Sequence, residues 1–457
     1  MLDQTLTEIV YGSSDAASRQ SYYRSQSSID LAHLVMLERR QLVERDAVQA
    51  LARTIVELRE TDFEALLHVP SPRGAFVAYE EFLMDKLGPD VGGRLHTGRS
   101  RNDLNATISS MSVRSAWLEI LEATAQTVEV LERKADEHAD SPFPAFTHAQ
   151  PAMPSTFGAY LGNVGLSVAH IGQQVAAMQH YFDSCPLGAC AGYGTSIPID
   201  PQITAHLLGY AQGPIGSIAA VADRSAASLL LGQLAELSTL YSRVAADLQF
   251  WSSGAVGLVF FPDNLVGQSS IMPQKRNAFV LENIKARCAS IIAAHMQSLV
   301  SMKSAPYTNT IEVSSEAISG FSDAVAEYRG TATLVNWHLD GAAPQVDVAR
   351  QVMRQGNVGA TFEAEQAVIR DGVAFREAYN AVRTKIQSTG ASPSVSEDCQ
   401  AVEPAEFGAG PSAVQTRRIC NQLRRYREEL STTAEKALSR IDKSAGKLRK
   451  EAEELLR

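Results

Sequence analysis

Several features that mark particular protein classes are scarce in this sequence of 457 residues. Its five cysteines are odd in number and include no C-x-x-C pair, which argues against a disulfide framework and against a zinc site. Lys and Arg number 41 against 51 Asp and Glu, and the net charge of −10 disfavours nucleic acid or an anionic membrane surface as a partner. The N-terminus lacks the basic start and apolar run of a secretion signal, so we expect a cytoplasmic protein.

Charge is nearly absent from one long stretch. Between Ser141 and Ile199 the only charged residue is Asp183, and residues 157–182 within it form a helical segment rich in small residues and amides. The amides, histidines and glycines are too many for a membrane span. A helix without charge on any side is expected to be buried all round. One chain can hardly bury several such long helices, so we expect a bundle built from several copies.

Alternating β-branched runs joined by hairpin turns are also missing, whereas helical periodicity is strong. Apolar residues recur every three or four positions from Leu230 to Leu248, and residues 104–135 and 281–302 behave similarly. We predict an all-α fold with an N-terminal helical region (1–98), a central region of long helices (99–349) and a C-terminal region (350–457). In the last, 388–412 reads as a loop and 427–457 as a charged helix with an apolar packing edge.

The sequence does contain one short segment with a high concentration of reactive and polar groups. Residues 268–277 read Q-S-S-I-M-P-Q-K-R-N and follow Gly267. The adjacent hydroxyls of Ser269 and Ser270, the ammonium of Lys275 and the amide of Asn277 suit a loop that holds a carboxylate and removes a proton beside it. An ordinary polar surface loop is the alternative interpretation.

Four more segments carry related chemistry. L-H-T-G-R-S-R-N-D at 95–103 offers guanidinium groups that fit carboxylates, or it is an N-capping turn with solvated arginines. His148, in F-T-H-A-Q-P, is a proton relay tuned by burial, or a satisfied core histidine. The glycine-rich turn 186–192 reads mainly as backbone packing. Arg224 is a substrate clamp or half of an ion pair, and Asp223 before it can cap a helix.

In this order on a helical frame, the segments resemble the fumarase/aspartase superfamily and, within it, the argininosuccinate lyases. The resemblance spans roughly residues 30–420. It is carried by H-T-G-R-S-R-N-D at 96–103, T-H-x-Q at 147–150, P-L-G-x-x-A-G at 186–192 with P-I-D at 198–200, A-V-x-D-R at 220–224, and S-S-I-M-P-Q-K-R-N at 269–277.

This resemblance implies a three-region fold whose central bundle of long helices is shared across a homotetramer, with each active site formed by three subunits. It implies β-elimination from an N-substituted aspartate, which breaks a C–N bond and releases fumarate without a metal or organic cofactor. Ser269 would be the base, activated by loop N–H groups and Lys275, and His148 would be the proton relay or leaving-group partner. Gly267 would be a loop hinge. The residues expected to bind the dicarboxylate substrate are Ser100, Arg101, Asn102, Thr147, Gln150, Arg224, Ser270, Lys275 and Asn277.

Departures from the family pattern fall mostly on the leaving-group side. The family stretch Y-N-R-D-x-Q-x-x-K corresponds here to P-Y-T-N-T-I-E-V at 306–313, and E-D-I-H corresponds to A-L-L-H at 65–68. An N-terminal Ser/Asp pair has no clear match near residues 13–24. The succinyl half of the site is therefore expected to be retained and the arginine half altered, so the amine product need not be arginine. A paralogue for another N-succinyl-type substrate, a cycloisomerase, an adenylosuccinate-type lyase and a non-catalytic crystallin-like protein are the alternatives.

Overall fold

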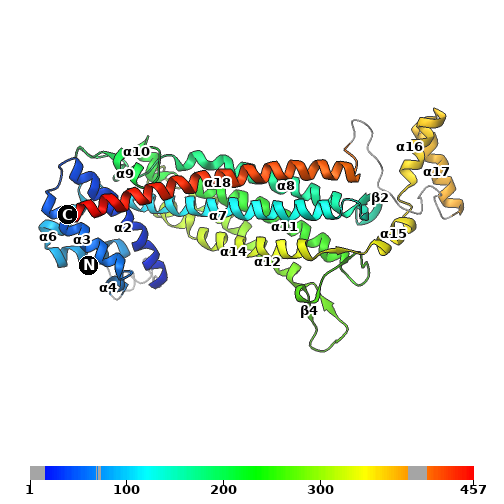
Figure 1. Cartoon of the computed structure of the whole chain (residues 1–457), viewed down its shortest axis with the longest axis horizontal. Helices are drawn as coiled ribbons and strands as arrows, with labels where there is room; N and C mark the ends of the chain where they lie inside the picture. Colours follow the sequence, from blue (N-terminus) through cyan, green and yellow to red (C-terminus); the bar gives the residue numbers. More distant parts are fainter. Residues whose placement is uncertain (1–15, 68, 70–73, 390–408) are drawn as a thin grey trace.

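The protein is an elongated helical bundle with a compact helical cluster at one end (Figure 1). The computed structural model describes residues 16–67, 69, 74–389 and 409–457. Six long helices form the bundle, and they alternate in direction along the chain. Their bounds are α7 (Arg101–Glu137), α8 (Phe157–Ala177), α11 (Ser225–Trp251), α12 (Phe279–Met302), α14 (Phe321–Gly341) and α18 (Ala413–Leu455).

The N-terminal cluster has its own hydrophobic core. Phe63, Tyr79 and Leu95 are buried there together with Leu448 and Leu455 from the end of α18. Its elements are α2 (Ala16–Arg39), α3 (Arg45–Glu60), α4 (Glu64–Leu67), α5 (Ala75–Leu87), α6 (Pro89–Gly92), η1 (Gly93–His96) and α9 (Pro201–Leu207).

Short elements lie between the helices and at the far end of the bundle. The hairpin of β1 (Pro142–Thr147) and β2 (Gln150–Thr156) is antiparallel and has an irregularity after Ala145. The pairs β3 (Val259–Phe260) with β6 (Ala343–Pro344) and β4 (Gly267–Gln268) with β5 (Arg276–Asn277) are also antiparallel. The remaining elements are η2 (Met178–Phe182), α10 (Ser217–Ala222), η3 (Asp263–Leu265), α13 (Ile311–Ser314), η4 (Glu316–Ile318), α15 (Val346–Gln355), α16 (Ala360–Asp371) and α17 (Phe375–Thr389).

The predicted all-α architecture is confirmed, and the periodic segments form the bundle. The apolar stripe from Leu230 to Leu248 is buried along α11, whose neighbours are α12, α8 and α14. The β1–β2 hairpin was not anticipated. Its strands contain Pro142, Pro144, Pro151 and Pro154, which a two-stranded ladder accommodates because each strand is an edge.

The helical part of the charge-poor segment is α8, and its glycines allow it to pack closely against α18. A Cβ at Gly165 would lie 2.7 Å from Leu423, and one at Gly172 would lie 2.9 Å from Leu430, so α8 and α18 approach closely only because these side chains are absent. The opposite side is exposed in a single chain and carries uncharged polar residues: Asn163, Ser167, His170 and Gln174. Burial of α8 on all sides is therefore not achieved within one copy.

The tail helix α18 begins earlier than predicted and lies along the bundle. It contacts α7 and α8 along its length and reaches α2, α3 and α9 at its end. Ion pairs line its contact with α7, including Arg424 with Glu132 and Arg427 with Glu129, both at 2.8 Å. The division at 98 and 349 stays a prediction, and most of the predicted loop 388–412 lies outside the described residues. No helix in the described part of the chain is both long and apolar enough to cross a membrane.

Candidate functional site

The start of α7 is held by a capping arrangement that leaves three polar side chains within reach of solvent. Ser100 is the N-cap, and its hydroxyl accepts a hydrogen bond from the backbone N–H of Asn102 at 3.3 Å, while the Asp103 carboxylate accepts from the Ser100 N–H at 2.9 Å. Arg101 is exposed, and Ser100 and Asn102 are half-buried. This strip (Ser100–Asn102) presents a hydroxyl, a guanidinium and an amide at a helix N-terminus, which favours anions.

The first arginine of the motif has a structural role. Arg99 forms an ion pair with Asp30 at 2.5 Å, and both side chains are fully buried. Burial raises the pKa of Asp30, whereas the adjacent Arg99 guanidinium lowers it. The sequence analysis assigned no role to Asp30. Its position among Ile29, Leu31 and Ala32 in α2 was the available signal, since a carboxylate in such a stretch requires a partner.

Asp103 joins this strip to the glycine-rich turn 186–192. Its second carboxylate oxygen accepts the backbone N–H groups of Gly188 and Cys190, both at 2.9 Å, and the Cys190 thiol donates to the Gly98 carbonyl. Gly188 has φ +105°, and a Cβ there would lie 2.6 Å from Pro201, so glycine is required. The expected backbone-packing role of this turn thus has a specific anchor in Asp103.

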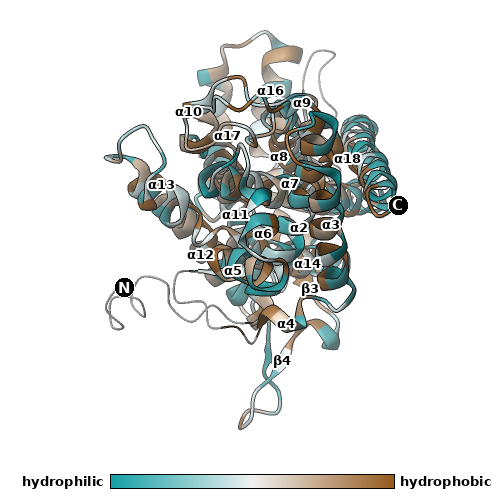
Figure 2. Cartoon of the chain, turned by 90° about the vertical axis from the view of Figure 1, so that its left-hand side faces the viewer, coloured by the Kyte–Doolittle hydropathy of each residue, from teal (hydrophilic) through white to brown (hydrophobic). Residues whose placement is uncertain are grey.

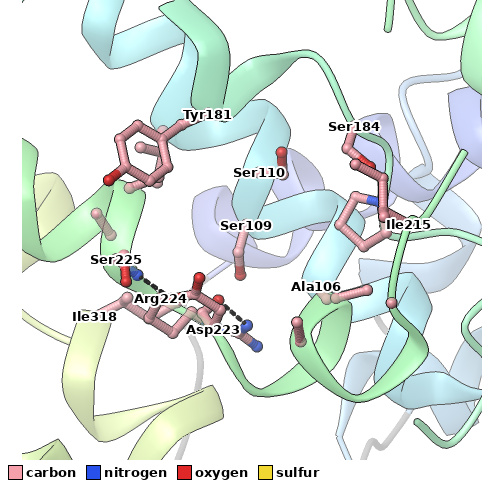
Figure 3. Close-up of a pocket in the computed structure, with 17 residues that line it drawn as sticks. Ala106, Ser109, Ser110, Tyr181, Ser184, Ile215, Asp223, Arg224, Ser225 and Ile318 are labelled. Carbon is pink, nitrogen blue, oxygen red and sulfur yellow. Dashed lines mark hydrogen bonds between the residues drawn. The ribbon is translucent and has the colours of Figure 1, made fainter. Parts of the chain in front are cut away.

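Arg224 lines a cavity of about 260 Å³ between α7, α10 and the start of α11 (Figure 3). Its side chain is buried, and its Nη1 donates to the backbone carbonyl of Asp223 at 2.9 Å. Burial lowers the pKa of the Arg224 guanidinium, and the neighbouring Asp223 raises it. Arg224 pairs with a carbonyl oxygen here and is itself the N-cap of α11, while the Asp223 carboxylate before it accepts the N–H of Ser225, the first residue of that helix, at 2.7 Å.

Thr147, His148 and Gln150 lie at the tip of the β1–β2 hairpin. All three are exposed, so His148 is not a core histidine in the single chain. His148 and Ala149 form the turn with φ of 52° and 59°, a left-handed conformation that costs a non-glycine residue energy. Strain of this kind is concentrated at functional turns. The hairpin tip therefore presents a hydroxyl, an imidazole and an amide at the surface of the single chain.

The loop 269–275 joins β4 to β5 and projects away from the helices (Figures 1 and 2). Within it, the Ser269 Oγ accepts the backbone N–H of Met272 at 3.1 Å and of Ile271 at 3.4 Å. Two N–H groups on one hydroxyl oxygen stabilise negative charge at that oxygen. Ser270 and Lys275 are exposed and Asn277 is half-buried, so the loop offers these groups outward.

Arg276 anchors the base of this loop, a role that the sequence analysis missed. Its Nη2 donates to the Phe261 carbonyl and to Asp263, both at 2.7 Å, and its guanidinium lies 4.4 Å from the centre of the Phe260 ring. Gly267 lies against Phe279, where a Cβ would come within 2.8 Å of the ring. The loop is therefore fixed at its base and open at its tip.

One copy of the chain does not bring these three groups together. The strip Ser100–Asn102 precedes α7, whereas Thr147–Gln150 follows it, and the 37 residues of α7 span about 55 Å at 1.5 Å per residue. No hydrogen bond among the described residues connects the loop 269–275 to the strip or to the hairpin tip. If these side chains act on one molecule, different copies of the chain must supply them.

Comparisons with known proteins identify the family to which the chain belongs. A family model described as "Lyase" matches residues 26–293. Argininosuccinate lyase 1 of Shouchella clausii is 30% identical over 387 residues, which cover 84% of this chain and 78% of that protein. Argininosuccinate lyase of Methanocorpusculum labreanum is 31% identical over 81% of this chain and 75% of the relative.

Solved structures share the fold. EDDS lyase in complex with formate superposes with a TM-score of 0.85 and 21% identity, covering 96% of this chain and 92% of the other. Class II fumarase from Schistosoma mansoni gives a TM-score of 0.64 at 15% identity, covering 81% of this chain and 89% of the other. These likenesses concern the fold of the chain.

Proposed function

Because the chain belongs to the lyase family of the fumarase/aspartase superfamily, we propose that it breaks the C–N bond of an N-substituted aspartate and releases fumarate and an amine. The observation that carries this proposal is the environment of Ser269, whose oxygen accepts two backbone N–H groups in a loop that also carries Lys275. The argininosuccinate lyases among its relatives support the same reaction class.

In this reaction a base removes the proton from the carbon next to one carboxylate, the C=C bond forms, and the C–N bond breaks. Ser269 acts as that base in its alkoxide form, which the N–H groups of Ile271 and Met272 and the positive charge of Lys275 in the same loop favour. The intermediate carries two negative charges on one carboxyl group, and fixed donors aimed at that charge lower the barrier. His148 returns a proton to the departing amine or relays it.

The substrate carboxylates are held by donors from all three groups. The strip supplies Ser100, Arg101 and Asn102 at a helix N-terminus. The hairpin tip supplies Thr147 and Gln150, and the loop supplies Ser270, Lys275 and Asn277. Gly267 permits the loop to close over the substrate and exclude water. Since one chain holds these groups apart, we propose that the active unit is a homotetramer in which three copies build each site.

The proposed function has two versions, which differ in the amine that is released: arginine or another amine. Argininosuccinate is the substrate named for the relatives. In this chain the segment 306–313 lacks the Gln and Lys that the family pattern places there, and Tyr307 and Glu312 are exposed. We therefore favour a paralogue that releases an amine other than arginine. Turnover of argininosuccinate as fast as that of a genuine argininosuccinate lyase would exclude this version.

The test uses purified protein, fumarate with a panel of amines, and fumarate absorbance. Ser269→Ala should lower kcat by at least about 10³-fold without changing the oligomer, because it removes the base. Unchanged activity would refute the assignment, and an inactive wild type towards every amine and towards argininosuccinate would favour the non-catalytic, crystallin-like alternative.

Mixing inactive variants tests whether copies share sites. Subunits of Ser269→Ala and Arg101→Gln, refolded together, should regain part of the activity because some sites then receive an intact loop and an intact strip. The matched control mixes Ser269→Ala with Lys275→Gln. Both changes lie in one loop, so no site receives an intact one and activity should stay absent. Equal recovery in both mixtures, or in neither, would contradict the shared site.

A further inference from the structure

The cavity at Arg224 has features that the proposed roles leave unexplained. Its walls are largely small and apolar, with Ala106, Ala219 and Ala227 among them, and its polar lining residues include Ser109, Ser110 and Asp223 (Figure 3). At about 260 Å³ it is slightly smaller than a typical ligand pocket. A compact group with an apolar part and a polar end would fit such a space.

Among the described residues, Arg224 is the only cation that lines this cavity, and its hydrogen bonding is incomplete. Its side chain is 6% exposed, and its buried Nε has no acceptor among the described residues. The Nη1 atom donates only to a backbone carbonyl. A buried guanidinium with a free donor is costly unless a ligand completes it, and a carboxylate matches its planar donors. The cavity is therefore suited to one carboxylate.

The cavity lies further along α7 from the strip Ser100–Asn102. Ala106, Ser109 and Val113 follow Asn102 at helical spacing on one face of α7, and all three line the cavity. Pro186, another lining residue, belongs to the turn that Asp103 anchors. The axial distance from Asn102 to Ser109 is about 10 Å at 1.5 Å per residue. A four-carbon diacid bound at the strip does not extend that far, so the cavity receives what is attached to it.

We propose that this cavity is the subsite for the amine half of the substrate, and that Arg224 binds a carboxylate on that half. The leaving amine is then an amino acid with a small side chain. This inference rests on the proposed fumarate-releasing function and adds the class of the second product. It assigns Arg224 to the leaving group, whereas the strip, the hairpin tip and the loop hold the succinyl half.

The experiment runs the reaction backwards with matched pairs of amines that differ by one carboxylate. Fumarate is incubated with glycine or methylamine, with L-alanine or ethylamine, and with L-arginine or agmatine. The amino acid of the small pairs should react at least about tenfold better in kcat/KM than its partner, the effect of one charge-assisted contact. Equal rates within each pair, or a preference for the amines, would overturn the proposal.

Variants then test whether Arg224 causes the preference for an amino acid over the amine that lacks its carboxylate. Arg224→Gln should reduce this preference to below about threefold and raise the KM for the amino acid while leaving the KM for fumarate unchanged. Arg224→Lys should retain part of it. Asp223, the carboxylate that already lines the cavity, accepts the Ser225 N–H. Ser109→Asp adds a second carboxylate without removing Arg224 and should act like Arg224→Gln. Arg243→Gln removes an exposed arginine from the same helix and is the matched control.

Binding separates this inference from the reaction itself. Calorimetry with L-alanine and ethylamine, in the presence of fumarate and with Ser269→Ala protein, needs no turnover. The subsite is supported if L-alanine binds and ethylamine does not, and if L-alanine no longer binds the Arg224→Gln, Ser269→Ala double variant. This result would hold even if the elimination proposal failed. If neither compound binds the Ser269→Ala protein, or if the double variant still binds L-alanine in preference to ethylamine, the subsite assignment is wrong whatever the catalytic activity.

Discussion

Asp103 should be the residue on which the geometry of the strip depends most. It is fully buried, and its carboxylate accepts three backbone N–H groups, from Ser100, Gly188 and Cys190, each at 2.9 Å. Hydrogen bonds to a charged group contribute about 1.5–3 kcal/mol each, and they are not additive. Asp103→Ala leaves buried N–H groups without acceptors, so we expect a loss of about 3–5 kcal/mol in the free energy of unfolding. Asp103→Asn keeps one acceptor oxygen and should lose about 2–3 kcal/mol.

Urea unfolding gives these free energies, and amide hydrogen exchange gives their location. The peptide covering residues 186–192 should exchange faster in both variants, and the KM for fumarate should rise because the strip shifts. Asp136→Asn on the same helix is the matched control, since Asp136 is exposed and its one ion pair among the described residues, with Arg417, is 3.8 Å long. If Asp103→Asn were as stable as Asp136→Asn and exchange at 186–192 were unchanged, the anchoring argument would fail.

Two further predictions concern the loop and the pH dependence of stability. Gly267→Ala should push Phe279 aside, because the new Cβ would lie 2.8 Å from its ring. The shift should displace Ser269 and lower kcat/KM about tenfold. Adding Phe279→Ala should restore activity, and a double variant that stays impaired would contradict the contact. Burial, together with the smaller effects of Arg99 and His96, lowers the pKa of His33 to about 3, although the hydrogen bond to the Thr97 carbonyl opposes this shift. Below about pH 6.5 the unfolded chain therefore binds a proton that the folded chain does not, and the free energy of unfolding should fall by about 1.4 kcal/mol per pH unit. His33→Gln should flatten this dependence between pH 6 and 4.5, and an equal slope in both proteins would refute it.

Periodicity predicted the helices well because each long helix buries one continuous stripe. The stripe on α11 and the extent of α12 follow from local spacing alone. The β1–β2 hairpin escaped prediction because its four prolines suggest a loop, and only the pairing with a second edge strand makes them acceptable. The reach of α18 also depends on distant partners, namely the acids of α7 and the N-terminal core.

The candidate site was predicted as a set of residues, and only the family resemblance implied that several copies of the chain build it. The motifs identified Arg101, His148 and Ser269 as candidates, and the helical segment predicted at 104–135 already separated the first two along the chain. The positions of the three groups relative to one another depend on long-range packing, which local patterns do not contain. The ion pair of Asp30 with Arg99 was missed for the same reason, since the partners lie 69 residues apart. Local patterns report which faces are apolar, and long-range pairs appear only when the chain is folded.

The arrangement also indicates which part of the site moves. The strip is fixed by Asp103 and by Arg99, and α18 packs on both cores, so the N-terminal cluster and the bundle are held together. The loop 269–275 is fixed only at its base, by Arg276 and the β4–β5 pairing, and Ile271 at its tip is 83% exposed. Ordered closure over a substrate is therefore expected from this loop rather than from a movement between helices. Substrate binding should then protect the amides of Ile271 and Met272 from hydrogen exchange, while those of Gly188 and Cys190 stay protected throughout.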